Sequence, residues 1–175
     1  MSSTKKLVIS GLSIALGLVL PFLTGQIPTI GNMLLPMHVP VLLCGFVCGW
    51  KYGLITGFIL PILRSIMLSS PPMFPIAIAM AFELAGYGLL TGLLYERWTK
   101  STTNIMITLV LSMLGGRVIW GMVSFVLFRM VGNMLTWEMF MAGAFINAIP
   151  GIILQLILIP SMVLALQKSK VIESV

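Results

Sequence analysis

Three ionisable side chains fall inside long apolar stretches, where a charged group is unfavourable unless it is paired or serves a function. These are Arg64, Glu83 and Arg117, and each is surrounded by mainly aliphatic, aromatic and small residues. An ionisable side chain at the centre of a membrane helix costs roughly 2.5–3.5 kcal/mol on insertion scales, so such residues tend to pair with one another or serve a functional site. We therefore take all three as candidate ligand-binding residues.

Four neutral side chains could complete a binding site with them. His38 and Asn147 offer polar groups in apolar surroundings, and Trp120 and Tyr87 offer aromatic walls. Tyr87 follows Glu83 by four residues, so the two share one face of a helix. The expected substrate-binding set is therefore His38, Arg64, Glu83, Tyr87, Arg117, Trp120 and Asn147.

Structural explanations compete with ligand binding for several of these residues. Arg64 and Glu83 could form an ion pair across a tight turn. Arg117 could donate to backbone carbonyls, and Asn147 could make a hydrogen bond between helices, a common contact in helical bundles. His38 could be a solvated loop residue. Because all of them fall in the same half of their segments, the cluster is more informative than any one member.

The charges in this set constrain the ligand. Two arginines and one glutamate leave a surplus positive charge if all are ionised, and an uncompensated buried charge is expensive. An anionic ligand would remove the surplus, because a carboxylate can accept two hydrogen bonds from one guanidinium. Alternatively, Arg64 could extend to the membrane interface. The site would then be neutral and suit a polar heterocycle.

The sequence offers no constellation for catalysis or for a metal ion. His38 is its single histidine, and Cys44 and Cys48 sit in an apolar run without acidic neighbours, which is typical of buried structural thiols. The sequence also contains no phosphate-binding loop. We expect no catalytic residue, no metal and no cofactor on this chain, and any ATP use would belong to a partner.

Composition sets the class of protein that must position these residues. Of the 175 residues, 59% are hydrophobic and only 8% are charged, against about 45–50% and about 25% in soluble domains. A soluble enzyme, a disordered chain and a disulfide scaffold are excluded. The net charge of +6 does not indicate a nucleic-acid partner, because basic residues of membrane proteins mark cytoplasmic loops. The chain is expected to be one all-α integral membrane domain, residues 1–175, in a lipid bilayer.

Breaks at residues 26–36, 50–52, 69–75, 96–103 and 129–138 divide the chain into apolar segments. The second segment is short for a span, since a membrane helix needs about 20 apolar residues. This segment could be a helix with little tilt, a helix broken near Pro40, or a helix continued by irregular backbone from Gly31 to Pro36. Six transmembrane helices are predicted, at roughly 7–24, 36–50, 52–69, 74–96, 104–128 and 139–167.

The basic residues outside the spans predict the orientation. With a cytoplasmic N-terminus, only Arg129 would lie on the outside, a strong bias of positive charge to the inside. Both termini are then cytoplasmic in a multi-pass plasma-membrane protein, and the polar cluster lies in the outer half of the bundle. The basic residues on the inner side would be Lys5, Lys6, Lys51, Arg97, Lys100, Lys168 and Lys170.

Because the polar cluster lies only in the outer half of the bundle, it predicts a pocket that opens to the outside. A channel would need polar residues through the full depth of the membrane. A stand-alone secondary carrier, with Glu83 as a proton relay, is the alternative class, although no internal repeat of the kind found in many carriers is visible.

Small residues in the first helix indicate a contact with another helix. Gly11 and Ala15 are four residues apart, as are Ser13 and Gly17, and small residues at this spacing let two helices approach closely. The pair Gly11 and Ala15 lies near the cytoplasmic end and is the expected partner-docking site.

Three stretches resemble a known family. They are Leu35-Pro-Met-His-Val-Pro-Val-Leu-Leu-Cys-Gly-Phe, Leu60-Pro-Ile-Leu-Arg-Ser and Met80-Ala-Phe-Glu-Leu-Ala-Gly-Tyr-Gly-Leu-Leu-Thr-Gly-Leu-Leu-Tyr. Together with the six helices and the outward pocket, they resemble the substrate-binding S component of energy-coupling factor (ECF) vitamin transporters. The resemblance covers nearly the whole chain and is strongest to the branch for pantothenate, pyridoxine and hydroxymethylpyrimidine.

The resemblance implies a subunit that captures a vitamin outside the cell with high affinity. It would then dock on a transmembrane T subunit carrying two ATPases, which use ATP to drive import. Gly11 and Ala15 match the positions of the family's Ala-xxx-Ala motif, with glycine in place of the first alanine. The surplus positive charge favours pantothenate as the vitamin, with pyridoxine and hydroxymethylpyrimidine as alternatives.

Overall fold

The computed structural model describes residues 1–24 and 33–169, and within them every regular element is a helix. The described residues form seven α-helices, with a π-helical turn, η1, before α5 and a 3-10 turn, η2, before α8. Their bounds are α1 Ser3–Thr24, α3 His38–Cys48, α4 Trp50–Leu68, η1 Met73–Ala77, α5 Ile78–Arg97, α6 Thr102–Met130, α7 Trp137–Ala144, η2 Ile146–Ala148 and α8 Ile149–Lys168.

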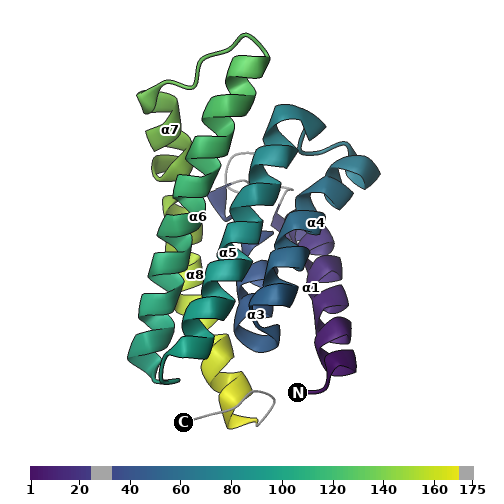
Figure 1. Cartoon of the computed structure of the whole chain (residues 1–175), viewed down its shortest axis with the longest axis vertical. Coiled ribbons are helices and arrows are strands. Elements are labelled where there is room, and N and C mark those ends of the chain that lie inside the picture. Colours follow the sequence, from purple (N-terminus) through teal and green to yellow (C-terminus); the bar gives the residue numbers. More distant parts are fainter. Residues whose placement is uncertain (25–32, 170–175) are drawn as a thin grey trace.

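The helices form an up-and-down bundle with α3 and α5 near its centre (Figure 1). The N-terminus and the end of α8 lie at the same end of the bundle, and the α4–α5 and α6–α7 turns lie at the opposite end. The predicted all-α class is confirmed.

Five candidate membrane spans have sufficient length and hydropathy among the described residues. They are Ser3–Leu23, Trp50–Leu68, Met73–Arg97, Thr102–Met130 and Trp137–Lys168. The sixth predicted segment corresponds to α3, which has 11 residues and reaches only about 16 Å. Pro40 does not break it, because proline is tolerated in the first turn of a helix.

Non-helical backbone precedes α3. Leu35 has a φ of 50°, and turns occupy residues 34, 36 and 37. Of the irregular stretch predicted from Gly31 to Pro36, residues 31 and 32 lie outside the described residues. Such backbone is tolerated at membrane depth only where protein or a hydrated cavity surrounds it, and Gly151 of α8 indeed packs against the backbone of Met33 and Leu34.

One predicted boundary is wrong, and one predicted helix is interrupted. The second and third segments are separated at Gly49, not at residues 50–52, because Gly49 has a φ of 88°, a conformation that glycine adopts without strain. The last segment is not one continuous helix: α7 ends at Ala144 and α8 begins at Ile149. Pro150 explains this break, since it lacks an N–H and its ring would clash with the preceding turn of a continuous helix.

Glycines bring α3, α4 and α5 into contact, backbone against backbone. A Cβ at Gly88 would collide with the Gly53 carbonyl, and one at Gly57 would collide with the Leu84 carbonyl. A Cβ at Gly45 would lie 2.8 Å from the Gly88 carbonyl oxygen. These approaches fix the depth of α5 relative to its two neighbours.

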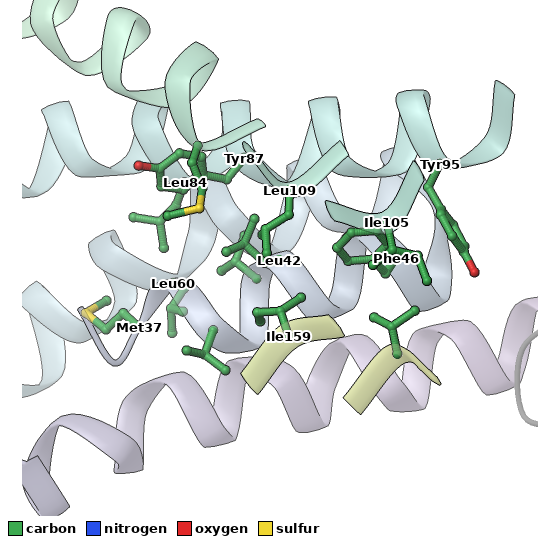
Figure 2. Packing of buried hydrophobic residues seen from close by; sticks show 14 residues of the cluster. Met37, Leu42, Phe46, Leu60, Leu84, Tyr87, Tyr95, Ile105, Leu109 and Ile159 are labelled. Atoms are coloured by element: carbon green, nitrogen blue, oxygen red, sulfur yellow. The ribbon is translucent and has the colours of Figure 1, made fainter. Parts of the chain in front are cut away.

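An apolar core lies between these helices and α6 and α8. Leu42, Leu109 and Ile159 meet in its middle, and Phe46, Ile105 and Tyr95 continue it toward the end that carries the termini (Figure 2). Outside the core, large apolar side chains such as Leu7, Val118 and Ile157 are more than half exposed. An apolar exterior of this kind fits lipid.

Candidate ligand-binding site

Glu83 is buried in the first half of α5 and is only 4% exposed. The next residue, Leu84, presents its carbonyl to Gly57 of α4. The close approach of these two helices therefore holds Glu83 inside the bundle.

Three side chains converge on one oxygen of this carboxylate. The Tyr87 hydroxyl donates a hydrogen bond to Glu83 Oε1 at 3.0 Å. His38 Nε2 and Arg117 Nε each lie 3.6 Å from the same oxygen. We call His38, Glu83, Tyr87 and Arg117 the Glu83 cluster; its members come from α3, α5 and α6 and are all at most 5% exposed.

Local sequence explains how the cluster is assembled. His38 is the first residue of α3, so the turn before it sets the direction of the ring, whose centroid lies 5.2 Å from that of Tyr87. A Cβ at Gly116 would collide with the Tyr87 ring. Glycine at 116 therefore lets Tyr87 lie flat on α6, beside Arg117.

The cluster retains hydrogen-bonding capacity that the described protein groups do not use. His38 Nδ1 and Nε2 and Arg117 Nε and Nη2 are buried without a hydrogen-bond partner, while Arg117 Nη1 donates to the Gly143 carbonyl at 3.4 Å. An unsatisfied buried polar group is costly, and more so in lipid. The arrangement can therefore donate to, and accept from, a small polar ligand.

Arg64 takes part in other contacts. Its Nε donates to the Ser70 carbonyl at 3.0 Å, and its guanidinium lies 6.0 Å from the centroid of the Phe22 ring. The side chain is half-buried at the end of α4 next to the α4–α5 turn. Of the two arginines considered, the ion pair with Glu83 is made by Arg117.

Asn147 and Trp120 also lie outside the Glu83 cluster. Asn147 is exposed on the η2 turn, where the last segment is interrupted. Trp120 is half-buried on α6 and stacks on Phe140 of α7 with ring centroids 6.0 Å apart. Gly143 packs against this indole ring while its carbonyl accepts from Arg117, so Trp120 and the cluster share a neighbour.

Sequence reasoning left Gln155 of α8 out of the expected site, although this polar side chain is only 1% exposed. Its place could have been found from the spacing of Gly151, Gln155 and Ile159, since residues four apart share a helix face.

The expected docking pair faces outward. Gly11 and Ala15 are exposed on α1, and a Cβ at Gly11 would meet no atom within 4 Å. The alternate pair faces the bundle, since Ser13 is buried and Gly17 packs on Leu60 of α4.

The two cysteines are buried free thiols, as predicted. Cys44 Sγ lies 3.5 Å from the hydroxyls of Ser10 and Thr56, so it joins α1, α3 and α4. Among the described residues, no three His, Cys, Asp or Glu side chains are grouped to hold a metal ion.

Comparison with known proteins gives one match. Neither a curated protein nor a solved structure shows significant similarity to the chain. A family model described as "ECF transporter, substrate-specific component" matches residues 5–163, which include all the helices that carry the Glu83 cluster. The apolar exterior, the span-length helices and this match together place the chain in the family of ECF transporter substrate-specific components.

Proposed function

We propose that this chain captures a small vitamin or vitamin precursor at the Glu83 cluster and hands it to an ATP-driven importer. The observation that carries the proposal is the set of buried nitrogen atoms of His38 and Arg117 that surround the Glu83 carboxylate and have no hydrogen-bond partner. Few polar groups placed in otherwise apolar walls are typical of small-molecule sites.

The charges favour a neutral or weakly basic heterocycle, such as pyridoxine or hydroxymethylpyrimidine. Arg64 donates to the Ser70 carbonyl, so it does not add to the charge around Glu83. Arg117 and Glu83 balance each other, so this pair leaves no surplus positive charge that calls for an anion. The Glu83 carboxylate would accept from a ring N–H, an amino group or a hydroxyl of the ligand.

Pantothenate stays the second candidate because of Arg117. Two nitrogens of this guanidinium, Nε and Nη2, have no hydrogen-bond partner, and a guanidinium edge is well suited to a carboxylate. Pantothenate binding would require the ligand to compete with Glu83 for Arg117, and this competition makes it the less favoured ligand.

Transport would depend on other subunits. We infer docking on a transmembrane T subunit with two ATPases, through the exposed face of α1 at Gly11 and Ala15. The chain would lie in the plasma membrane with both termini cytoplasmic and the Glu83 cluster in the outer half. A stand-alone carrier that uses Glu83 as a proton relay is the competing mechanism; it would transport in liposomes without ATPases.

Mass spectrometry of small molecules retained by the purified protein tests the proposal. We expect a retained heterocyclic vitamin, and calorimetric titration should rank pyridoxine or hydroxymethylpyrimidine above pantothenate. Tight binding of pantothenate, without binding of pyridoxine or hydroxymethylpyrimidine, would make pantothenate the proposed ligand. If nothing is retained and none of the three compounds binds, the chain does not capture a vitamin of this branch.

A further inference from the structure

One face of α8 is buried along its whole length, and it repeats every four residues. Among its members are two glutamines, Gln155 and Gln167. Side chains elsewhere on the helix are exposed, to 54% at Ile153 and 66% at Ile157. Residues four apart project from the same side of a helix. The buried residues are Gly151, Gln155, Ile159, Pro160, Val163 and Gln167, and all of them except Pro160 follow the four-residue spacing.

The neighbours of this face set the depth of Gln155 in the bundle. One turn before it, Gly151 packs against the backbone of Met33 and Leu34, just ahead of His38. One turn after it, Ile159 joins the core with Leu42 (Figure 2). Gln155 therefore lies at the level of the first turn of α3, where His38 begins the helix.

The helices that α8 contacts are those that carry the cluster. Its packing partners include α3 and α6, which supply His38 and Arg117. Because Gln155 is only 1% exposed and belongs to the buried face, its side chain lies inside the bundle and not in lipid.

The two glutamines differ in their hydrogen bonds. Gln167 Nε2 donates to the Tyr95 hydroxyl at 2.9 Å and to the Lys100 carbonyl at 3.2 Å, so it ties the end of α8 to α5 and to the turn after it. Gln155 Nε2 is buried without a hydrogen-bond partner. A primary amide that stabilised only the fold would be expected to have such partners.

We propose that Gln155 is a ligand-contacting, specificity-determining residue whose amide N–H groups donate to an acceptor on the ligand. The proposal rests on the proposed function and extends the Glu83 cluster by a fourth helix. Glu83 and Gln155 would then address different ligand atoms, the carboxylate accepting from a donor and the amide donating to a ring nitrogen or hydroxyl oxygen. A ligand that presents both groups would be preferred over one that presents only a donor.

Matched substitutions on one helix face test this role. Gln155→Met and Gln167→Met both replace an unbranched amide by an unbranched apolar side chain of similar length. Each purified variant is assayed for thermal unfolding without ligand. Affinity is then measured by calorimetry with pyridoxine, hydroxymethylpyrimidine and pantothenate.

We expect opposite results for the two variants. Gln155→Met should unfold at or above the wild-type temperature, because an unpaired amide is removed, yet lose at least tenfold in affinity, which corresponds to about 1.4 kcal/mol. Gln167→Met should unfold at a lower temperature and keep its affinity within about twofold.

Two results would overturn the assignment. A lower unfolding temperature for Gln155→Met, like that of Gln167→Met, would make Gln155 structural; unchanged affinity would mean that its amide contacts no ligand. If none of the three vitamins binds the wild-type chain, the proposed ligand class fails separately. The comparison then uses small molecules retained through purification, which wild type and Gln167→Met should keep and Gln155→Met should lose; equal retention by all three chains would reject the proposal.

Discussion

At the scale of the residue, one carboxylate oxygen organises the site. Glu83 Oε1 accepts from Tyr87 and lies 3.6 Å from both His38 and Arg117. In a low-dielectric interior, removing one member of a buried charge pair is strongly destabilising because the other charge is left uncompensated. Substitutions here should therefore affect both ligand affinity and the stability of the unliganded chain.

Glu83→Gln keeps the size of the side chain but removes its charge. Arg117 is then buried without a counter-charge, and truncating one partner of such a pair costs about 3–5 kcal/mol. We expect a lower unfolding temperature and at least a hundredfold loss of vitamin affinity, measured by calorimetry on protein that still elutes as a single species. Tyr87→Phe is the control, since it removes one hydrogen bond and keeps the ring; it should cost much less. Wild-type affinity in Glu83→Gln would contradict the assignment of this site.

The two intramembrane arginines should behave differently. Arg117→Met removes the partner of Glu83 and should reduce vitamin affinity at least a hundredfold. Arg64→Met removes only a hydrogen bond to the Ser70 carbonyl and a ring contact, so affinity should stay within about threefold, because partly exposed contacts contribute on the order of 1 kcal/mol or less. Titration of both variants with the same vitamin checks this. An equal loss of vitamin affinity in both variants would mean that Arg64 also belongs to the binding site.

At the scale of the element, glycines decide how the helices meet. Gly88→Ala places a methyl group against the Gly53 carbonyl, and overpacking of this kind costs about 1–3 kcal/mol. We expect a clear fall in the unfolding temperature and weaker ligand binding, because α5 carries Glu83. Gly11→Ala is the matched control: its Cβ meets no atom, and alanine is the better helix former. Equal unfolding temperatures for the two variants would contradict backbone-to-backbone packing of α4 on α5.

The two small-residue pairs of α1 should also separate by function. Gly11→Leu and Ala15→Leu add bulk to the exposed face, so we expect nearly unchanged vitamin binding and unchanged stability but impaired transport when T subunit and ATPases are co-expressed. Gly17→Leu would collide with Leu60 and should destabilise the chain itself. Vitamin uptake by cells, set against calorimetry on the isolated chain, distinguishes the two effects. Normal uptake in both Gly11→Leu and Ala15→Leu would exclude this face as the docking surface.

At the scale of the whole molecule, the bundle has two unlike ends. The chain termini share one end and the α4–α5 turn lies at the other (Figure 1), so one labelling experiment fixes the orientation. With Cys44 and Cys48 buried, a cysteine introduced at exposed Ser70 should react with an impermeant maleimide from outside intact cells, whereas Ser169→Cys should react only after lysis. The reverse pattern would place the termini outside.

What the sequence by itself determined is local or compositional. Apolar runs of span length predicted the helices, because lipid tolerates only backbone that satisfies its own hydrogen bonds. Helix phase alone placed Tyr87 on the face of Glu83, and the hydrogen bond between them confirms it. The scarcity of ionisable residues in the spans singled out Glu83 and Arg117.

Only the tertiary structure decided which helices bring these groups together. The sequence alone does not distinguish Arg64 from Arg117 as the partner of Glu83. The rotation and depth of α5 relative to α4 and α6 determine which arginine lies beside the carboxylate. Those follow from contacts between residues far apart in sequence, such as Gly53 with Gly88 and Gly116 with Tyr87. Gln155 was left out of the expected site for a related reason. Its spacing on α8 indicates burial, but the absence of a hydrogen-bond partner for its Nε2 among the described residues can be recognised only when the neighbours of the side chain are in place.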